Sequence, residues 1–450
     1  MDTIVAVSTP PGRSAIAVLR LSGSRSLEIL RALVREDKFA PAPNRVTLKK
    51  LFAGCDDDLI DEALVTYFQS PRSFTGEDMV EISCHGSPVI LRRLMDLVQA
   101  YEARLAEPGE FTLRACRNGK MNLSEAEAIR DLINAQTQAA ARQAARQLRG
   151  ELAEALESSK QELIRVIVIL ESAVEFVEDD LPTIQINEIK NTLQTLAAAL
   201  TRLSDTYKAG HLLRDGLRVA IVGRSNVGKS SLFNRLVRLE RAIVTDIAGT
   251  TRDSLTETIS LEGVPVSITD TAGFREACDK IEAIGIERTR RAIADADMLV
   301  VVIDGSCSLQ QEDTEVLKAA CDHSFVVAIN KADLPQLPSV NNFFNDSRVV
   351  HLSALTEEGI SELMAAILEP FGSVDSAAAG LLITDSRHYD LLTRAKSSLD
   401  CASRSIEQGA SEELVLADLH NALKVLGAIT GETTSEDILG EIFSTFCIGK

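Results

Sequence analysis

The chain has 450 residues, a formal net charge of -19 and 45% hydrophobic residues. This length predicts about three domains at roughly 150 residues each, which can bury cores without disulfides or metals. The charge argues against a protein that coats nucleic acid with a broad basic surface, because such binding depends on neutralising phosphates. Any RNA contact is therefore expected to be local or shared with a partner.

The cysteines and the apolar runs bear on where in the cell the protein is expected. The 8 cysteines are scattered without a C-x-x-C pair, and no basic-then-apolar leader precedes Pro10-Pro11-Gly12. No window reaches the roughly 18 uninterrupted apolar residues of a membrane span, and Val166–Leu170 is a short piece of an amphipathic helix. We expect reduced thiols in the cytoplasm and no membrane span. The 6 histidines show no metal-ligand spacing, so zinc is not expected.

The first 120 residues mix short apolar runs with turn signals such as Pro108-Gly109. We expect a compact α+β domain over residues 1–120. Its strand-like runs are Thr3–Val7, Ala15–Leu21, Ala63–Phe68 and Met79–Ser83.

Long helices are predicted from Ser124 onwards. Ser124-Glu125-Ala126-Glu127 has the form of a capping box, and helical spacing then continues to about Tyr207. The single predicted break is Glu178–Pro182, and the arginines of residues 142–149 are expected on solvated helix faces. Residues 121–215 are therefore predicted as the first part of a helical domain.

From residue 216 to residue 370, strand-like and helical runs alternate, which predicts a mostly parallel sheet. Thr256–Leu261 and Val264–Ile268, joined by Glu262-Gly263, predict a hairpin at one side of it. After an Ala/Ser/Gly linker, helical periodicity returns over residues 371–450. We expect the α/β domain to be inserted into an all-α helical domain whose two halves pack together.

A phosphate-binding motif lies between the apolar run Leu217–Val222 and the helix-like Ser231–Leu239. It reads Gly223-Arg224-Ser225-Asn226-Val227-Gly228-Lys229-Ser230. Its glycines allow the backbone N–H groups to approach phosphates at a helix N-terminus. Lys229 is expected at the β- and γ-phosphates and Ser230 at Mg²⁺.

Four further motifs follow in the order of a guanine-nucleotide-binding domain. They are Thr250-Thr251, Asp270-Thr271-Ala272-Gly273, Asn330-Lys331-Ala332-Asp333 and Ser353-Ala354-Leu355. Thr251 is expected to complete the magnesium shell and Asp270 to hold its outer part. The carboxylate of Asp333 can accept two hydrogen bonds that guanine offers and adenine does not, while Asn330 is expected to read the other edge of the base. The sequence thus predicts a Ras-like P-loop GTPase rather than an ATPase with an accidental Asn-Lys-x-Asp.

One motif departs from Ras-type enzymes. Phe274 follows Gly273, so no Gln stands there to orient the attacking water. Glu282 lies in a polar segment between this turn and the next helix. From the residues alone, it is either a surface side chain or the water-positioning group.

Three further segments carry a resemblance to a known family. Thr245–Asp253, the opening Asp2–Ala6 with Pro10–Arg13, and the terminal Phe446-Cys447-Ile448-Gly449-Lys450 resemble the tRNA-modification GTPases called MnmE or TrmE. The likeness covers essentially the whole chain. It implies a homodimer that works with the FAD-dependent flavoprotein MnmG (GidA) on the wobble uridine of certain tRNAs, adding an aminomethyl or carboxymethylaminomethyl group.

The resemblance also implies ligands. A tetrahydrofolate would supply one carbon at an N-terminal folate-binding domain that also forms the dimer, with Arg20, Glu81, Lys120 and Lys450 at the folate. A K⁺ ion would lie near the phosphates, held by Asn226, Thr245, Ile247 and Thr250, and supply positive charge where other GTPases use an arginine. Glu282 would position water. Cys447 is either a packed thiol or a catalytic group, and the resemblance favours catalysis.

The complete set of residues expected at the GTP is long. It comprises Asn226, Val227, Gly228, Lys229, Ser230, Ser231, Thr245, Asp246, Ile247, Ala248, Gly249, Thr250, Asp270, Thr271, Ala272, Gly273, Asn330, Lys331, Asp333, Ser353 and Ala354. Two other functions remain as alternatives. One is an Era-like regulatory switch, which should carry a basic RNA-binding domain, and the other is a folate transferase in which the GTPase plays no part.

Overall fold

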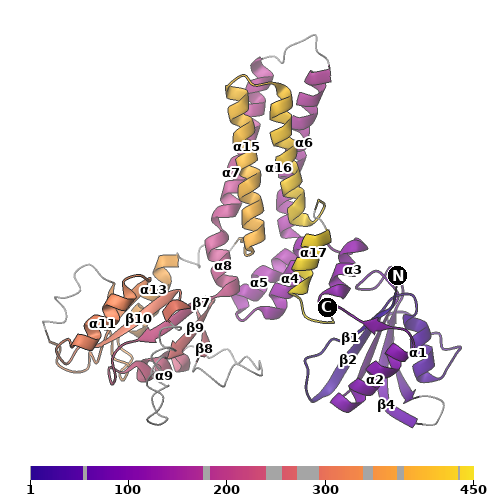
Figure 1. Cartoon of the computed structure of the whole chain (residues 1–450), viewed down its shortest axis with the longest axis horizontal. Coiled ribbons are helices and arrows are strands. Elements are labelled where there is room, and N and C mark those ends of the chain that lie inside the picture. Colours follow the sequence, from indigo (N-terminus) through magenta and orange to yellow (C-terminus); the bar gives the residue numbers. More distant parts are fainter. Residues whose placement is uncertain are drawn as a thin grey trace. The chain divides into compact units, whose positions relative to one another are not determined.

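A computed structural model describes residues 2–53, 58–175, 183–239, 256–270, 293–337, 348–371, 380–433 and 436–449. The chain forms two compact units (Figure 1). Unit 1 comprises Met1–Arg130, Leu148–Ala153 and Lys424–Lys450, and unit 2 comprises Asp131–Gln147 and Glu154–Leu423. Within the described ranges, no helix has the length and apolar character needed to cross a bilayer.

Unit 1 contains a six-stranded sheet of order β3-β4-β5-β2-β1-β6. Its strands are β1 (Ile4–Val7), β2 (Ser14–Ser22), β3 (Val46–Ala53), β4 (Asp58–Phe68), β5 (Met79–Gly86) and β6 (Arg104–Leu105). Alternate side chains of these strands are buried with α1 (Ser26–Val34) and α2 (Pro88–Ala100). The predicted α+β fold of this region is confirmed.

The end of the chain belongs to the same unit. α17 (Glu436–Ser444) lies next to α3 (Glu110–Arg117), and Phe443 and Phe446 are buried with Leu123. The two rings have their centroids 5.0 Å apart. This cluster fixes the start of the C-terminal tail within unit 1.

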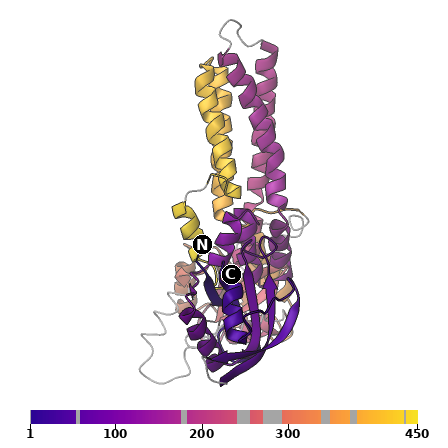
Figure 2. The same cartoon turned by 90° about the vertical axis from the view of Figure 1, so that its right-hand side faces the viewer.

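The helices form two runs separated by the second sheet. The first run is α4 (Leu123–Asn134), α5 (Gln138–Leu148), α6 (Glu151–Glu175), α7 (Thr183–Asp205) and α8 (Tyr207–Asp215), and the second includes α15 (Ser386–Glu407) and α16 (Glu412–Thr430). In Figures 1 and 2, α6, α7, α15 and α16 lie side by side. Lys190 of α7 pairs with Glu407 of α15 at 3.1 Å, and Glu171 of α6 with His420 of α16 at 3.1 Å. The predicted packing of the two halves is therefore observed.

Two details of the helical prediction were wrong. The capping box at the start of α4 is formed by Asn122 and Glu125 rather than by residues 124 and 127. The Asn122 side chain accepts from the Glu125 N–H at 2.9 Å, and the Glu125 carboxylate accepts from the Asn122 N–H at 2.9 Å. The helices also break after residues 134, 148 and 205, and Gly150 has a φ of 81° that ends helical geometry. The predicted break at 178–182 lies outside the described residues.

The second sheet lies in unit 2 and has the order β12-β11-β10-β7-β9-β8. Its strands are β7 (Leu217–Val222), β8 (Thr256–Leu261), β9 (Val264–Asp270), β10 (Met298–Asp304), β11 (Phe325–Asn330) and β12 (Val349–His351). Only β8 runs antiparallel to its neighbour among these described strands. The predicted hairpin is confirmed, since Glu262 and Gly263 adopt φ of 49° and 85° in its turn.

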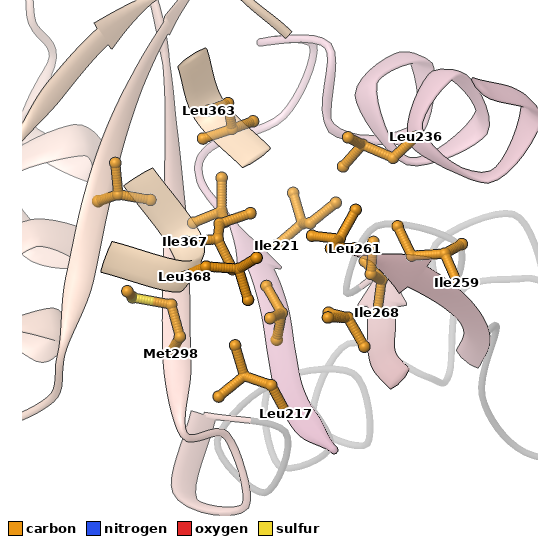
Figure 3. Packing of buried hydrophobic residues seen from close by; sticks show 14 of the residues in the cluster. Leu217, Ile221, Leu236, Ile259, Leu261, Ile268, Met298, Leu363, Ile367 and Leu368 are labelled. Atoms are coloured by element: carbon orange, nitrogen blue, oxygen red, sulfur yellow. The ribbon is translucent and has the colours of Figure 1, made fainter. Parts of the chain in front are cut away.

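The core of this sheet positions the loops at its edge. α9 (Lys229–Leu239) and α13 (Ile360–Leu368) contribute Leu236, Leu363 and Ile367 to a cluster with strand residues such as Ile221 and Met298 (Figure 3). α11 (Gln311–Ala320) packs with the other face of the strands. A short 3₁₀ turn, η1 (Glu369–Phe371), follows α13. The central strands β7, β10 and β11 are almost entirely buried, and close packing of this kind holds the loops at their ends rigidly.

Candidate nucleotide site and tail site

Five parallel strands of the second sheet end at one edge, where ligands of such sheets bind. The phosphate loop follows β7, and Asp270, Asp304 and Asn330 are the last residues of β9, β10 and β11. Ser353 comes two residues after β12. Motif residues far apart in the sequence are thereby brought to one edge.

The phosphate loop is closely packed. A Cβ at Gly223 would lie 2.4 Å from the Val302 carbonyl oxygen, and one at Gly228 would lie 2.2 Å from the Asn330 amide nitrogen. Both glycines have positive φ, 151° and 100°. The Lys229 ammonium donates to the carbonyls of Gly223 and Arg224 at 2.8 and 2.7 Å. The loop thus curls around the lysine at the N-terminus of α9, which suits an anion.

Asn330 joins two loops of the site. Its amide donates to the Val227 carbonyl at 2.8 Å, its oxygen accepts from the Ala354 N–H at 3.0 Å, and it is 3% exposed. Asn330 thereby braces the phosphate loop against the loop after β12. An amide group has two N–H donors, so a donation to Val227 is compatible with a second one to a base, and the role of Asn330 at an edge of the base stays a prediction.

Asp333 differs from Asn330 in being exposed. The buried Ser353 hydroxyl donates to one of its carboxylate oxygens at 2.6 Å and accepts from the Thr356 N–H at 3.1 Å. This contact orients the carboxylate at the surface of the loop. It can therefore accept hydrogen bonds from a base.

The donors available to a magnesium ion are hard oxygens, which this ion prefers. Ser230 is exposed in the first turn of α9, whereas Asp270 is 1% exposed at the end of β9. A hydroxyl and a carboxylate at this edge fit Mg²⁺ beside phosphates. The described residues therefore suit the expected ion.

Other expected ligands of the nucleotide are found on the same loops. Asn226 is exposed with a φ of 64°, Val227 and Ala354 are buried, Ser231 is exposed, and Lys331 has a φ of 68°. The remaining residues expected at the nucleotide, the metal ions, the attacking water (Glu282) and the folate (Lys450) lie outside the described residues. They are Thr245, Asp246, Ile247, Ala248, Gly249, Thr250, Thr251, Thr271, Ala272, Gly273, Glu282 and Lys450.

A second polar site lies in unit 1. Arg20 of β2 and Glu81 of β5 are direct cross-strand partners, and the Arg20 Nη2 donates to the Glu81 Oε1 at 2.7 Å. The guanidinium carbon lies 5.7 Å from the centre of the Phe74 ring and 5.9 Å from that of Phe111. The pair is half-buried. The sequence positions 20 and 81 are therefore brought together.

The C-terminal tail lies against this pair. The Gly449 carbonyl accepts from the Arg20 Nη1 at 3.3 Å and from the Ser8 hydroxyl at 3.1 Å. The Gly109 N–H donates to the Cys447 carbonyl at 3.4 Å, and the Cys447 side chain is exposed. Gly449 has a φ of 93°, and a Cβ there would lie 2.8 Å from the Val7 carbonyl oxygen.

Lys120 is near the same region. Its ammonium donates to the Pro71 carbonyl at 3.0 Å, and its Cγ would lie 3.3 Å from a Cβ at Gly76. The loop that it touches carries Phe74, the residue whose ring faces Arg20. Of the four residues expected at a folate, three therefore border one region of unit 1.

Sequence reasoning missed three charged residues beside the phosphate loop. Arg224 donates to Asp313 at 3.1 Å and lies 4.0 Å from Asp304, which in turn accepts from Lys331 at 2.6 Å. Asp304 was detectable only as a carboxylate at the end of a predicted buried strand. Arg224 lies at a variable position of its motif.

Comparisons with known proteins agree with the sequence reading. Residues 3–120 match the family described as GTP-binding protein TrmE N-terminus, and residues 123–447 match the MnmE helical domain. The tRNA modification GTPase MnmE of Koribacter versatilis is 44% identical over 100% of this chain and 99% of that relative. The proteins of the same name from Aquifex aeolicus and Latilactobacillus sakei are 41% and 39% identical, again over 100% of this chain, and over 100% and 98% of their own lengths. The resemblance read from the sequence is confirmed, and the chain belongs to the MnmE family of tRNA modification GTPases.

Proposed function

We propose that this GTPase drives modification of the wobble uridine of certain tRNAs, together with the FAD-dependent protein MnmG. GTP and Mg²⁺ would bind at the edge of the second sheet, and a tetrahydrofolate derivative would bind in unit 1. The observation that carries the proposal is the contact of the Cys447–Gly449 tail with the Arg20–Glu81 pair. This contact supports a second chemical site apart from the nucleotide site.

The chemistry of the unit 1 residues suits a folate. A carboxylate such as Glu81 can accept paired hydrogen bonds from a pterin, and cations such as Arg20 and Lys120 can bind glutamyl carboxylates. A bound tetrahydrofolate derivative would supply the one carbon that the modification needs. Cys447 is exposed beside this region and is the proposed reactive thiol. Lys450 is proposed as a further cation.

The proposed hydrolysis uses Lys229 and Ser230 at the phosphates and metal, and Asp333 at the guanine. A K⁺ ion held by Asn226, Thr245, Ile247 and Thr250 would add positive charge near the β- and γ-phosphates. Glu282 would position the attacking water. We expect hydrolysis to be faster in K⁺ than in Na⁺, and equal rates at matched ionic strength would contradict the cation site.

A homodimer is proposed from the outer face of the unit 1 sheet. Val46, Leu48 and Leu64 are 63%, 59% and 45% exposed, and Leu48 is the cross-strand partner of Leu64. Neighbouring exposed aliphatic side chains of this kind mark interaction surfaces. A cytoplasmic location is proposed from the described cysteines, which are all free thiols.

The test is nucleoside analysis of tRNA from cells that carry defined variants. Cys447→Ser should abolish the modification and leave GTP turnover largely intact. Glu282→Ala should bind GTP and hydrolyse it at least about tenfold more slowly. Unchanged wobble uridines in cells that lack the protein would reject the proposal. That result would instead favour an Era-like switch, in which GTP controls docking without RNA chemistry.

A further inference from the structure

Asp304 is a buried carboxylate at the end of β10 that belongs to none of the nucleotide motifs. It is 7% exposed. One of its oxygens, Oδ2, accepts from the Lys331 ammonium at 2.6 Å. The other, Oδ1, accepts from the Ser306 N–H at 3.0 Å and from the Ser306 hydroxyl at 2.6 Å. Burial raises the pKa of this carboxyl, but the hydrogen bonds from Lys331 and Ser306 outweigh burial and hold the pKa below its ordinary value.

Lys331 stands between the two functional residues of its motif, Asn330 and Asp333. It has a φ of 68°, a left-handed geometry that is unfavourable for a residue with a Cβ. The Asn330 side chain ties the loop to Val227 and Ala354, and the Lys331 side chain ties it to Asp304. The base loop is therefore held from two directions at adjacent residues.

The same carboxylate also faces the phosphate loop. The Arg224 guanidinium lies 4.0 Å from the Asp304 Oδ2 and donates to the Asp313 carboxylate at 3.1 Å. Asp313 forms the capping box at the start of α11. Asp304 thus lies between a cation of the phosphate loop and a cation of the base loop. A change at this carboxylate should reach the base loop most strongly, because Lys331 is its closer cation.

We propose that Asp304 is a positioning residue of the nucleotide site, which fixes Lys331 so that Asp333 presents its carboxylate to guanine. The inference rests on the proposed role of Asp333 at the base. It assigns to Asp304 a part in base discrimination as well as in affinity. A carboxylate that only stabilised the fold would affect all nucleotides alike.

The main test is Asp304→Asn in the full-length protein. The amide keeps the size of the side chain and an acceptor for Ser306, but it loses the ion pair with Lys331. We expect GDP to bind about tenfold more weakly through faster dissociation, since a hydrogen bond between charged groups is removed. The KM for GTP should rise by a similar factor, with a smaller change in kcat. Asp322→Asn, at an exposed acid after α11, is the matched control and should leave affinity unchanged.

Inosine triphosphate separates positioning from a structural effect. Inosine lacks the exocyclic amine from which Asp333 is proposed to accept a hydrogen bond. Asp304→Asn should therefore weaken the binding of GTP more than that of ITP and reduce the preference for GTP over ITP. Equal losses for the two nucleotides would overturn the inference. Should Asp304→Asn fail to fold, Lys331→Met removes the same ion pair from its more exposed partner and carries the same comparison.

Asp333→Asn is the reference for the proposed base site. It should move the preference from guanosine to xanthosine nucleotides. If it does not, the proposed role of Asp333 fails. If it does, and Asp304→Asn retains the full preference for GTP over ITP, only the role of Asp304 fails.

Discussion

The nucleotide site and the tail site, which Arg20, Glu81 and Gly449 form in unit 1, are built in different ways. In the phosphate loop, Lys229 donates to carbonyls only 5 and 6 positions away. In the tail site, Arg20 meets Glu81 across 61 positions and Gly449 across 429. The first site is therefore largely specified by a contiguous motif, whereas the second exists only after unit 1 has folded around the end of its chain.

This difference predicts how each site fails. A local loop depends on backbone geometry, so it should be most sensitive to the glycines that permit its shape. A site assembled from distant segments depends on the elements that hold those segments together. In unit 1 these elements include a buried ionic network next to β1 and the residues that seat the tail.

The largest effect is expected from the ionic network of unit 1. Arg114 is 5% exposed and pairs with Glu110, Glu77 and Asp2 at 2.9, 3.1 and 2.7 Å. Arg114→Met would leave the largely buried Glu77 carboxylate without this cation, whereas Glu110 and Asp2 would keep Arg104. Removing one partner of such a buried pair should destabilise unit 1 by about 3–5 kcal/mol.

Hydrogen exchange of peptides from the two units measures this effect. Peptides from β1, β2 and α3 should exchange faster in Arg114→Met, while those of β7, β10 and β11 should not change. Arg93→Met, which breaks an exposed pair with Asp58, is the control and should cost about 0–1 kcal/mol. Equal acceleration in both units would show that the two sites do not fold independently.

The next effect concerns the phosphate loop. Gly228→Ala places a Cβ 2.2 Å from the Asn330 amide at a φ of 100°. Backbone strain of about 1–3 kcal/mol should weaken nucleotide binding about 10- to 100-fold. Titration with a fluorescent GDP measures it. Gly409→Ala, in the turn between α15 and α16, has a φ of 65° and no atom within 4 Å, so as a control it should leave nucleotide binding unchanged.

A smaller effect is expected in the tail. Gly449→Ala would place a Cβ 2.8 Å from the Val7 carbonyl at a φ of 93°. Losing the tail contact should weaken the proposed binding of folate about five- to thirtyfold, since a left-handed backbone costs a residue with a Cβ roughly 1–2 kcal/mol. GTP turnover should not change. Gly409→Ala, also at positive φ and with no atom within 4 Å, lies in unit 2 and is the control, and an equal loss of folate affinity there would contradict the assignment to the tail.

The same contrast explains what the sequence could predict. The mostly parallel sheet and its hairpin follow from hydrophobic runs and turn residues, and both were confirmed. The pair of Asp304 with Lys331 could not be predicted, because it depends on which strand ends meet at the sheet edge. The capping box was placed two residues late, because Asn122 and Ser124 both have an acid three residues ahead. Only tertiary packing decides between them.

The smallest effect is a change in the stability of α8, in unit 2, as the pH varies around neutrality. His211 of α8 pairs with Asp215 at 2.7 Å, and the hydrogen bond that its imidazole donates to the Asp215 carboxylate raises the pKa of His211 above its ordinary value. A raised pKa in the folded state means that the protonated histidine stabilises the folded protein. Its contribution is therefore fully present below the unfolded pKa of about 6.5 and is lost as pH rises through the folded pKa. Peptides of α8 should exchange relatively faster at pH 8 than at pH 6 once intrinsic rates are divided out, and His211→Gln should remove this difference. If the pH dependence of α8 exchange persists in His211→Gln, another group causes it. If peptides of unit 1 show a pH dependence of equal size, the effect does not distinguish the two regions.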